Sequence, residues 1–447
     1  MRKQLVSGVL ALTLTVNLAG AGEIATRGDV GGPELGATYV IGKTRVLDPL
    51  NRLVVDVPKG WYAAVPIHGI FGTTTISNYD KGHAENWLPS HSNHVLLKEM
   101  AKIDLMTFDL GAAGSVEEWL DQRFSVGEWG EAKASASGKV AVQLAGRRGI
   151  ATVVQLGLSS KVELALAWKD GKVLLAGIAP LDTEDLGAAL AIVDSIRDGE
   201  TGGTHPRMVS QSQRFAPIRE LVRSELRRPG ARDDLSSINA AAGACNSWFG
   251  TDNGNCASGM SCASNASITL YLPFYYKTWW MAGGAGAFFG NYYHGNCNSD
   301  YYAVDFNQYS SSTCSSAVND TGQKVYAAAA GTATVGYDSG GFGNYVLVSH
   351  SNGYKTRYAH LQSIAVSSNQ SVTTQTILGY VGDTGSATGA PHLHFGYQTG
   401  GVSYCNKSGG CPNGEAARSP QTQKPSPMQT NLGSKAIVDY GCFQAPS

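Results

Sequence analysis

Two histidines near the C-terminus are the residues whose types and spacing first point to chemistry. The stretch "GAPHLHFG" at residues 389–396 places His392 and His394 one residue apart. If this stretch is a β-strand, alternation sends both imidazoles to one face, about 7 Å apart at Cα. Leu393 and Phe395 then point to the opposite face. The pattern therefore raises the possibility of half an active site on one side of a strand.

Three further residues have the chemistry to complete such a site. His294 lies in "GNYYHG", Asp305 in "YYAVDFN" and His360 in "TRYAHL". A catalytic zinc needs about three nitrogen or oxygen ligands and one open position for water. His294, Asp305 and one histidine of the HxH pair satisfy this count, with a net charge that lowers the pKa of the bound water. The remaining histidines can then transfer protons and stabilise the oxyanion.

Three motifs in this region occur together in a known family. The segments "YYAVDF", "GNYVLVSHSNGYKTRYAHLQSI" and "ILGYVGDTGSATGAPHLHFGY" follow one another between about residues 268 and 400. In content and order they resemble the lysostaphin-like, LytM-type zinc metalloendopeptidases, which include the β-lytic and staphylolysin-like proteases. The resemblance implies a compact antiparallel β-sheet with a groove. It also implies cleavage of peptide bonds in peptidoglycan stems or cross-bridges, or in Gly-rich proteins such as elastin.

The resemblance assigns a role to each candidate residue. It implies His294, Asp305 and His394 as ligands of one Zn²⁺ ion, and His360 and His392 as the catalytic histidines. The spacing departs from the commonest family pattern, in which the first ligand lies four residues before the aspartate. Here that position is Tyr301, and His294 lies eleven residues before Asp305, as in the β-lytic branch. Asp300 is a rival for Asp305, but "VDF" reproduces the family context.

The cysteines indicate an oxidising compartment. All eight lie in the C-terminal half: Cys245, Cys256, Cys262, Cys297, Cys314, Cys405, Cys411 and Cys442. An even number in an exported chain favours disulfides over thiolate zinc ligands, and no CxxC pair is present. Eight cysteines allow 105 pairings, so the connectivity cannot be deduced. Proximity suggests Cys297–Cys314 and Cys405–Cys411.

The N-terminus and the net charge limit which compartment and which partners we expect for the protein. Residues 1–21 carry Arg2 and Lys3, an apolar run and Ala19-Gly20-Ala21, as a cleavable signal peptide does. The run is shorter than the ~20 residues that span a bilayer, and no later segment spans one. We therefore expect a secreted or periplasmic protein with no membrane span after cleavage. A net charge of −1 gives no general attraction to nucleic acid.

The chain divides into differently composed parts. Residues 22–200 alternate strand-like runs with helical ones at 115–124 and 182–197, which predicts an α+β pro-domain. Residues 201–232 form a linker with a short basic helix over "IRELVRSELRR" and a possible processing site at Arg227, Arg228 and Arg232. Residues 233–447 are rich in Gly, Ser, Asn and Tyr, with short strands and no convincing long helix. They predict an all-β domain. The resemblance implies that this domain is an antiparallel, lysostaphin-like zinc metalloendopeptidase domain.

Other conspicuous residues have structural explanations. His350 is expected to be a satisfied structural histidine, and the "HSNH" cluster at 91–94 fits an ordinary polar loop. The aromatic residues of 271–280 suit a glycan groove or core packing about equally. "DSGGFGN" at 338–344 lacks the spacing and following helix of a phosphate-binding loop.

The leading hypothesis is a secreted zinc endopeptidase that acts on peptidoglycan peptides and is made as a zymogen, with the N-terminal domain removed by a processing protease. One alternative is a degenerate relative that binds cell wall or activates an amidase without catalysis. Another is a general protease of Gly-rich proteins. A permanent N-terminal domain that docks on a partner is the alternative to the propeptide.

Overall fold

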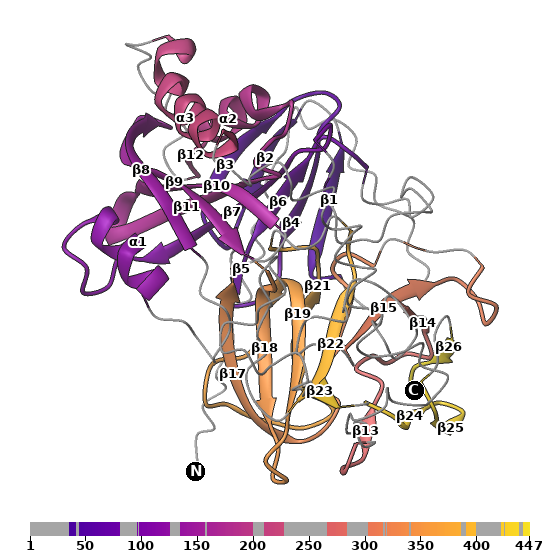
Figure 1. Cartoon of the computed structure of the whole chain (residues 1–447). Coiled ribbons are helices and arrows are strands. Elements are labelled where there is room, and N and C mark those ends of the chain that lie inside the picture. Colours follow the sequence, from indigo (N-terminus) through magenta and orange to yellow (C-terminus); the bar gives the residue numbers. More distant parts are fainter. Residues whose placement is uncertain are drawn as a thin grey trace, which may run out of the picture.

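The chain is mostly β-structure with few helices (Figure 1). The computed structural model describes residues 35–41, 44–80, 96, 98–125, 135–156, 159–199, 210–227, 266–283, 303–315, 318, 320–338, 341–385, 390–398, 422–423, 425–437 and 441–447. The described residues up to 227 are called the N-terminal body below, and those from 266 on the C-terminal body. The predicted signal peptide lies outside the described residues, as do His294, Asp300 and the "HSNH" cluster.

The N-terminal body is built on an eight-stranded antiparallel sheet in the order β1-β4-β6-β7-β11-β10-β9-β8, with a small sheet β12-β3-β2 beside it. Its strands are β1 (Ala37–Ile41), β2 (Thr44–Asp48), β3 (Leu53–Val57), β4 (Tyr62–Pro66), β5 (Phe71–Gly72), β6 (Thr74–Ser77), β7 (Lys102–Asp109), β8 (Ser135–Leu144), β9 (Arg147–Leu156), β10 (Ser159–Ala167), β11 (Lys172–Ala179) and β12 (Arg197–Asp198). Its helices are α1 (Val116–Ser125), α2 (Leu186–Asp194) and α3 (Gln211–Leu226), with a 3-10 turn at Lys169–Gly171.

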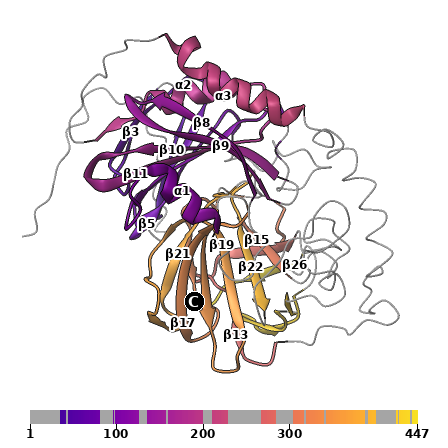
Figure 2. The ribbon, with the colours of Figure 1, turned by 60° about the vertical axis from the view of Figure 1, so that its left-hand side comes forward.

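The two faces of this sheet bury different residues. On β7, Ile103 and Leu105 point into the main core together with α2 and α3. Alternation sends Lys102, Asp104 and Met106 to the opposite face. Figure 2 shows α2 and α3 on the side remote from the C-terminal body. The face that bears Lys102 and Asp104 is therefore the one turned towards the other half of the chain.

The helices begin where local hydrogen bonds allow. A capping box opens α1, the helix predicted over 115–124, since the Ser115 hydroxyl accepts from the Glu118 amide. α2 starts at Leu186, later than predicted, because Thr183 accepts from the Asp185 amide in a turn. α3 starts at Gln211, so the helix predicted from the basic motif is its second half.

The C-terminal body contains only strands among its described elements. They are β13 (Leu270–Tyr271), β14 (Trp279–Gly283), β15 (Val304–Tyr309), β16 (Lys324–Tyr326), β17 (Gly331–Asp338), β18 (Gly343–Ser349), β19 (Lys355–Ile364), β20 (Ser371–Val372), β21 (Ile377–Val381), β22 (Leu393–Gln398), β23 (Thr422–Gln423), β24 (Met428–Thr430), β25 (Gly433–Lys435) and β26 (Gly441–Gln444). The main path of its sheet is β20-β17-β18-β19-β22-β15-β14-β26. Each pair along this path is antiparallel.

One strand of this sheet comes from the N-terminal body. β5 pairs antiparallel with the end of β19, where Gly72 opposes Ser363 and Phe71 opposes Ile364. The amides of Ile70 and Thr73 donate to the carbonyls of Ile364 and Gln362. The two bodies are therefore joined by a continuous β-ladder, at the junction labelled β5 in Figure 1.

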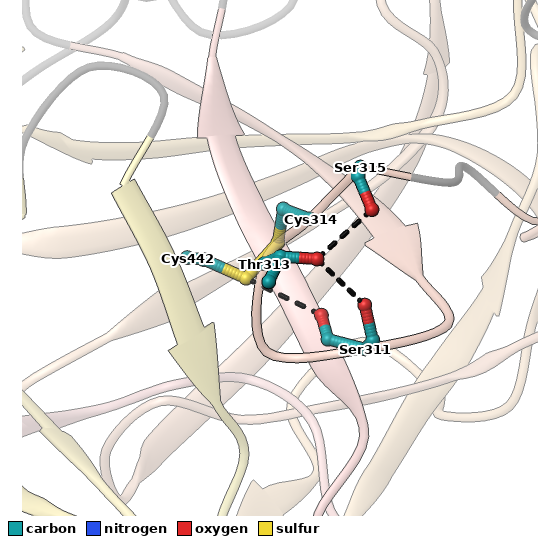
Figure 3. Close-up of a disulfide and its surroundings, with 5 residues drawn as sticks. All are labelled: Ser311, Thr313, Cys314, Ser315 and Cys442. Atoms are coloured by element: carbon teal, nitrogen blue, oxygen red, sulfur yellow. Dashed lines mark hydrogen bonds between the residues drawn. A yellow bond between two sulfur atoms is a disulfide. The ribbon is translucent and has the colours of Figure 1, made fainter.

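A disulfide links Cys314, in the turn after β15, to Cys442 on β26, with their Cα atoms 5.8 Å apart (Figure 3). The predicted Cys297–Cys314 pairing is therefore wrong. The two cysteines meet because β26 pairs with β14, which pairs in turn with β15. Cys405 and Cys411 lie outside the described residues. No helix in the described part of the chain has the length and hydropathy to cross a bilayer.

Candidate metal and catalytic site

Asp305 and His394 stand directly opposite each other on the antiparallel strands β15 and β22. Opposed residues of such a pair carry their side chains on the same face of the sheet. Nδ1 of His394 lies 3.2 Å from Oδ1 of Asp305, and both residues are 2% exposed. On the other side of β22, His394 opposes Ala359 of β19, which places only a methyl group beside the imidazole. Strand register thus builds the first half of the site.

His392 reaches the same carboxylate from just before β22. Its backbone forms an isolated antiparallel bridge with Gly382, and its Nε2 lies 3.6 Å from Oδ1 of Asp305. A Cβ at Gly382 would come within 2.4 Å of the Gln362 amide nitrogen, so this close approach requires glycine. The structure therefore confirms the prediction that His392 and His394 share one face.

His360 joins this group through an irregularity in β19. The pairing with β18 shifts register between Asn344 and Val346, and His360 has a positive φ of 59°. Tyr358 and Leu361, three positions apart, both point into the core of the C-terminal body. The extra residue between them is re-aimed, as β-bulges do. The His360 ring centroid consequently lies 4.8 Å from that of His392 and 5.7 Å from that of His394.

Backbone carbonyls determine which ring nitrogen carries the proton in His360 and in His392. Nδ1 of His360 lies 2.9 Å from the Thr384 carbonyl oxygen, and Nδ1 of His392 lies 2.8 Å from that of Ala390. A carbonyl only accepts, so Nδ1 must be the donor in both rings. When such a ring is neutral, Nε2 carries the lone pair. Both histidines are thereby prepared as bases.

The site is nearly closed to water and is flanked by aromatic and cationic groups. His360, His392 and His394 are each at most 2% exposed. The Phe342 ring lies 5.1 Å from the His394 ring, and the Arg357 guanidinium lies 4.0 Å from the Phe342 centroid. Electrostatic interactions are stronger in such low-dielectric surroundings. The arrangement favours chemistry in which charge develops on a substrate.

The donor set fits a zinc ion in part. Two ligands bound to tetrahedral zinc at about 2.0–2.1 Å are separated by about 3.4 Å. The separation of 3.2 Å between Nδ1 of His394 and Oδ1 of Asp305 is close to this value. The described residues contain no group of three His, Cys, Asp or Glu side chains arranged to hold a metal. His294, the third ligand predicted from the sequence, is not among them.

A buried carboxyl group lies behind the histidine pair. The amide nitrogen of Asn307 donates to the Pro391 carbonyl at 3.0 Å and to Oδ2 of Asp320 at 3.5 Å. Burial raises the pKa of Asp320 to about 8, although hydrogen bonds from Gln308 and Asn307 lower it and the charge of Asp383 raises it further. Asp320 is therefore a neutral acid over much of the physiological range.

His350 has a structural role, and of the aromatic segment Phe274 and Trp280 pack in the core while Tyr271 and Tyr276 are exposed. Both ring nitrogens of His350 have partners, the Ala330 carbonyl and the Thr356 hydroxyl, and burial lowers the pKa of His350. Phe274 and Trp280 of the aromatic segment stack at 3.4 Å in the core. These residues lie in packing positions, as the core-packing interpretation expects.

Sequence reasoning missed the groups that orient the histidines. Thr384 and Ala390 act through backbone carbonyls, which no side-chain type reveals. Both lie in the segment "GDTGSATGAP" that was already noted as a motif. Its density of small residues before the HxH pair was the available signal that backbone groups at Thr384 and Ala390 could approach the histidine rings closely.

The N-terminal body contacts the chain beside the site. The Lys102 ammonium donates to the carbonyls of Asp383 and Gly385, which flank Thr384. The Gly385 amide donates to Asp104 at 2.9 Å. The N-terminal body therefore contacts the same short loop that orients His360.

Comparisons with known proteins cover mainly this half of the chain. The model of peptidase family M23 matches residues 314–406, which include His360, His392 and His394, while Asp305 precedes them. The DD-carboxypeptidase/endopeptidase Mpg of Neisseria meningitidis is 42% identical over 74 residues, which is 17% of each chain. The peptidoglycan DD-endopeptidase ShyA of Vibrio cholerae is 40% identical over 74 residues, again 17% of each.

The matched segments thus span less than a fifth of these curated relatives. Among solved structures, the deep-sea M23 metalloprotease pseudoalterin is 28% identical, and the match covers 30% of this chain and 71% of that one with a TM-score of 0.22. The catalytic domain of lysostaphin from Staphylococcus simulans is 26% identical over 28% of this chain and 76% of that one, with a TM-score of 0.20.

Proposed function

Because this chain contains a peptidase family M23 domain, we propose that it is a zinc endopeptidase that hydrolyses peptide bonds in bacterial peptidoglycan. The observation that carries the proposal is the convergence of Asp305, His360, His392 and His394 from three strands and one bridge onto a single buried site. Two curated relatives of the matched segment are named as a DD-carboxypeptidase/endopeptidase and as a peptidoglycan DD-endopeptidase, which supports this substrate class.

We assign Asp305 and His394 as zinc ligands, together with His294 as the sequence predicts. A bound zinc ion would supply a Lewis acid that lowers the pKa of water and polarises the scissile carbonyl. The Asp305 carboxylate offsets part of the ion's charge, and its place on β15 opposite His394 fixes the ligand directions before the ion binds.

His360 and His392 perform the proton transfers in this proposal. Each keeps its Nδ1 proton on a carbonyl, so Nε2 takes the proton of the attacking water. The resulting imidazolium then donates from Nε2, either to the oxyanion of the tetrahedral intermediate or to the leaving amine. Because the rings of His360 and His392 are close, a positive charge on one disfavours protonation of the other. At each step, one ring is therefore the protonated acid while the other stays neutral.

We also propose that the protein is exported as a precursor and that the N-terminal body is a propeptide. Two features support this: the signal-like residues 1–21 in the sequence, and the contacts of Lys102 and Asp104 with the loop beside His360. An N-terminal body bound to this loop would keep bulky peptidoglycan from reaching the histidines. Removal by a processing protease then opens the site outside the cytoplasm.

Digestion of purified peptidoglycan, with mass spectrometry of the released fragments, tests the activity. We expect new peptide amino and carboxyl termini, loss of activity in His394→Ala, and retention of activity in His350→Gln, which alters a histidine outside the site. Cleavage of elastin without cleavage of peptidoglycan would overturn the substrate assignment. Full activity of His394→Ala without stoichiometric zinc would overturn the mechanism.

Mass spectrometry of the secreted active protein tests the precursor. We expect an N-terminus beyond Arg227, the last described residue of the N-terminal body. An active enzyme that still begins near Gly22 would rule the propeptide out.

A further inference from the structure

Lys102 and Asp104 present an ammonium and a carboxylate side by side to the loop Asp383–Gly385. They are alternate residues of β7, so their side chains share one face of the strand. Nζ of Lys102 lies 3.8 Å from Oδ1 of Asp104, and the two residues are only 2% and 6% exposed. The pair thus offers both charges of an amino-acid zwitterion within one small, desolvated space.

The loop Asp383–Gly385 complements both charges. Its carbonyl oxygens at Asp383 and Gly385 accept from the Lys102 ammonium, whose Nζ lies 2.6 Å from the Gly385 oxygen. The Asp383 carboxylate lies 3.8 Å from the same nitrogen. The Gly385 amide donates to Oδ2 of Asp104 at 2.9 Å. Two carbonyls and one carboxylate thus serve the ammonium, while one amide serves the carboxylate.

The shape of this loop is set within the C-terminal body. Gly385 has a φ of 88°, and a Cβ there would come within 2.3 Å of the Gly341 carbonyl oxygen. The Thr384 hydroxyl donates to the Leu361 carbonyl at 2.9 Å and accepts from the Asn344 amide at 2.9 Å. All of these contacts are made within the C-terminal body and none depends on a residue of the N-terminal body. The recognition groups of the loop are therefore a property of the catalytic half.

The loop also adjoins the reacting groups. Between its two recognition residues stands Thr384, whose carbonyl orients His360 at 2.9 Å. Gly382, the residue before the loop, pairs with His392. A ligand held by the loop would therefore lie beside the two proposed catalytic histidines.

We propose that the loop Asp383–Gly385 is a substrate subsite for a zwitterionic group, and that Lys102 and Asp104 occupy it in the full chain. This inference rests on the proposed endopeptidase function. It names the preferred substrate as a branched peptide in which one arm ends in a free amino acid, with ammonium and carboxylate on the same carbon. Peptides whose arm is acetylated or amidated lack one of the two charges.

Ligand rescue in the full chain tests the subsite without reference to zinc or activity. The variant Lys102→Ala/Asp104→Ala leaves the loop groups in a polar cavity that alanine zwitterion can fill. Alanine should raise the unfolding temperature of this variant more than that of the unaltered chain. Betaine, a zwitterion with no N–H donor, should have equal effects on both proteins. An alanine effect no larger than that of betaine would overturn the proposal.

Two further variants keep this test decisive. Adding Asp383→Asn to the double variant should reduce the specific effect of alanine, because the carboxylate beside the ammonium is lost. If the double variant fails to fold, Lys102→Ala/Asp383→Asn and Lys102→Ala can be compared with ethylammonium as the probe. Equal responses of these two variants to ethylammonium would contradict a role of Asp383 in binding.

Kinetics with paired substrates test the proposal in the processed enzyme. Acetylation of the amine on the free arm of a stem peptide should lower kcat/KM by about tenfold, the effect of losing one charge-assisted hydrogen bond. In Asp383→Asn the ratio between the two substrates should fall towards one. Equal hydrolysis of both substrates by the unaltered enzyme would overturn the subsite. Hydrolysis of neither would instead overturn the proposed endopeptidase function.

Discussion

The ring centroids of His360 and His392 lie 4.8 Å apart. Both rings are oriented by backbone carbonyls of one chain segment, that of Thr384 for His360 and that of Ala390 for His392. His360 comes from a bulge in β19, whereas His392 comes from the bridge before β22. His360 does not reach the site through regular strand alternation, whereas His392 shares the face of His394 two residues later. A common segment therefore sets the protonation pattern of two residues that reach the site by different routes.

Loss of either ring should impair proton transfer while leaving metal binding intact. His360→Ala and His392→Ala are each expected to lower kcat by roughly 10²–10⁴-fold, the usual contribution of a general acid or base. Zinc content, measured by elemental mass spectrometry on the same samples, should stay at the unaltered level. A variant that loses zinc together with activity would show that its histidine is a ligand instead.

Replacing Asp305 should lower the zinc content together with the activity, unlike replacing His360 or His392. Asp305→Asn removes the only negative charge among the proposed ligands. It also replaces a carboxylate by an amide oxygen, which is a much weaker zinc ligand. We expect both the zinc content and the activity to fall, and excess zinc to restore part of the activity. Asp109→Asn is the matched control, because that carboxylate is 82% exposed on the N-terminal body. Zinc content equal in Asp305→Asn and in the control would contradict the assignment.

Asp320 should make the protein less stable as the pH rises. Its pKa is raised by burial from 3.8 to about 8, so the folded state keeps a proton that the unfolded state releases between these values. The contribution of Asp320 to the free energy of unfolding is fully present and independent of pH below pH 3.8, and it is lost progressively from there to about pH 8. Asp320→Asn cannot ionise and should remove this contribution.

Urea unfolding at pH 5 and pH 8 measures the effect. The difference in midpoint between the two pH values should be smaller in Asp320→Asn than in the unaltered chain. Asp109→Asn should leave the difference unchanged. An Asp320→Asn variant with the same pH dependence as the unaltered chain would show that Asp320 is ionised when folded.

Much of the candidate site could be predicted because it depends on residue type and strand period. The HxH spacing alone places two imidazoles on one face, and "VDF" supplies a carboxylate. The opposition of Asp305 and His394 depends on the register of two strands far apart in the sequence, which local patterns do not encode. The bulge at His360 likewise depends on the pairing of β18 with β19.

Long-range pairing also explains what was missed in the fold. The Cys314–Cys442 bond follows from the place of β26 at the end of the sheet, whereas sequence proximity suggested Cys297. The insertion of β5 into the second sheet has no sequence signature, because Phe71-Gly72 is too short to show alternation. Charged residues such as Lys102 normally face solvent, so the burial of Lys102 against the other half was equally hidden.

The ladder between β5 and β19 should control how firmly the N-terminal body is held. A Cβ at Gly72 would come within 2.9 Å of the Ser363 Cβ and 3.1 Å of the Gln362 carbonyl oxygen. Gly72→Val should therefore push β5 away from β19 and lengthen the hydrogen bonds from Ile70 and Thr73. Hydrogen exchange at these two amides should become faster, and the uncut chain should gain activity on peptidoglycan. The control is Gly114→Ala, where an added Cβ meets only the carboxylate end of the flexible Glu118 side chain. Unchanged exchange in Gly72→Val would mean that the ladder does not hold the two bodies together, and faster exchange without any gain in activity would mean that this contact does not restrain the site.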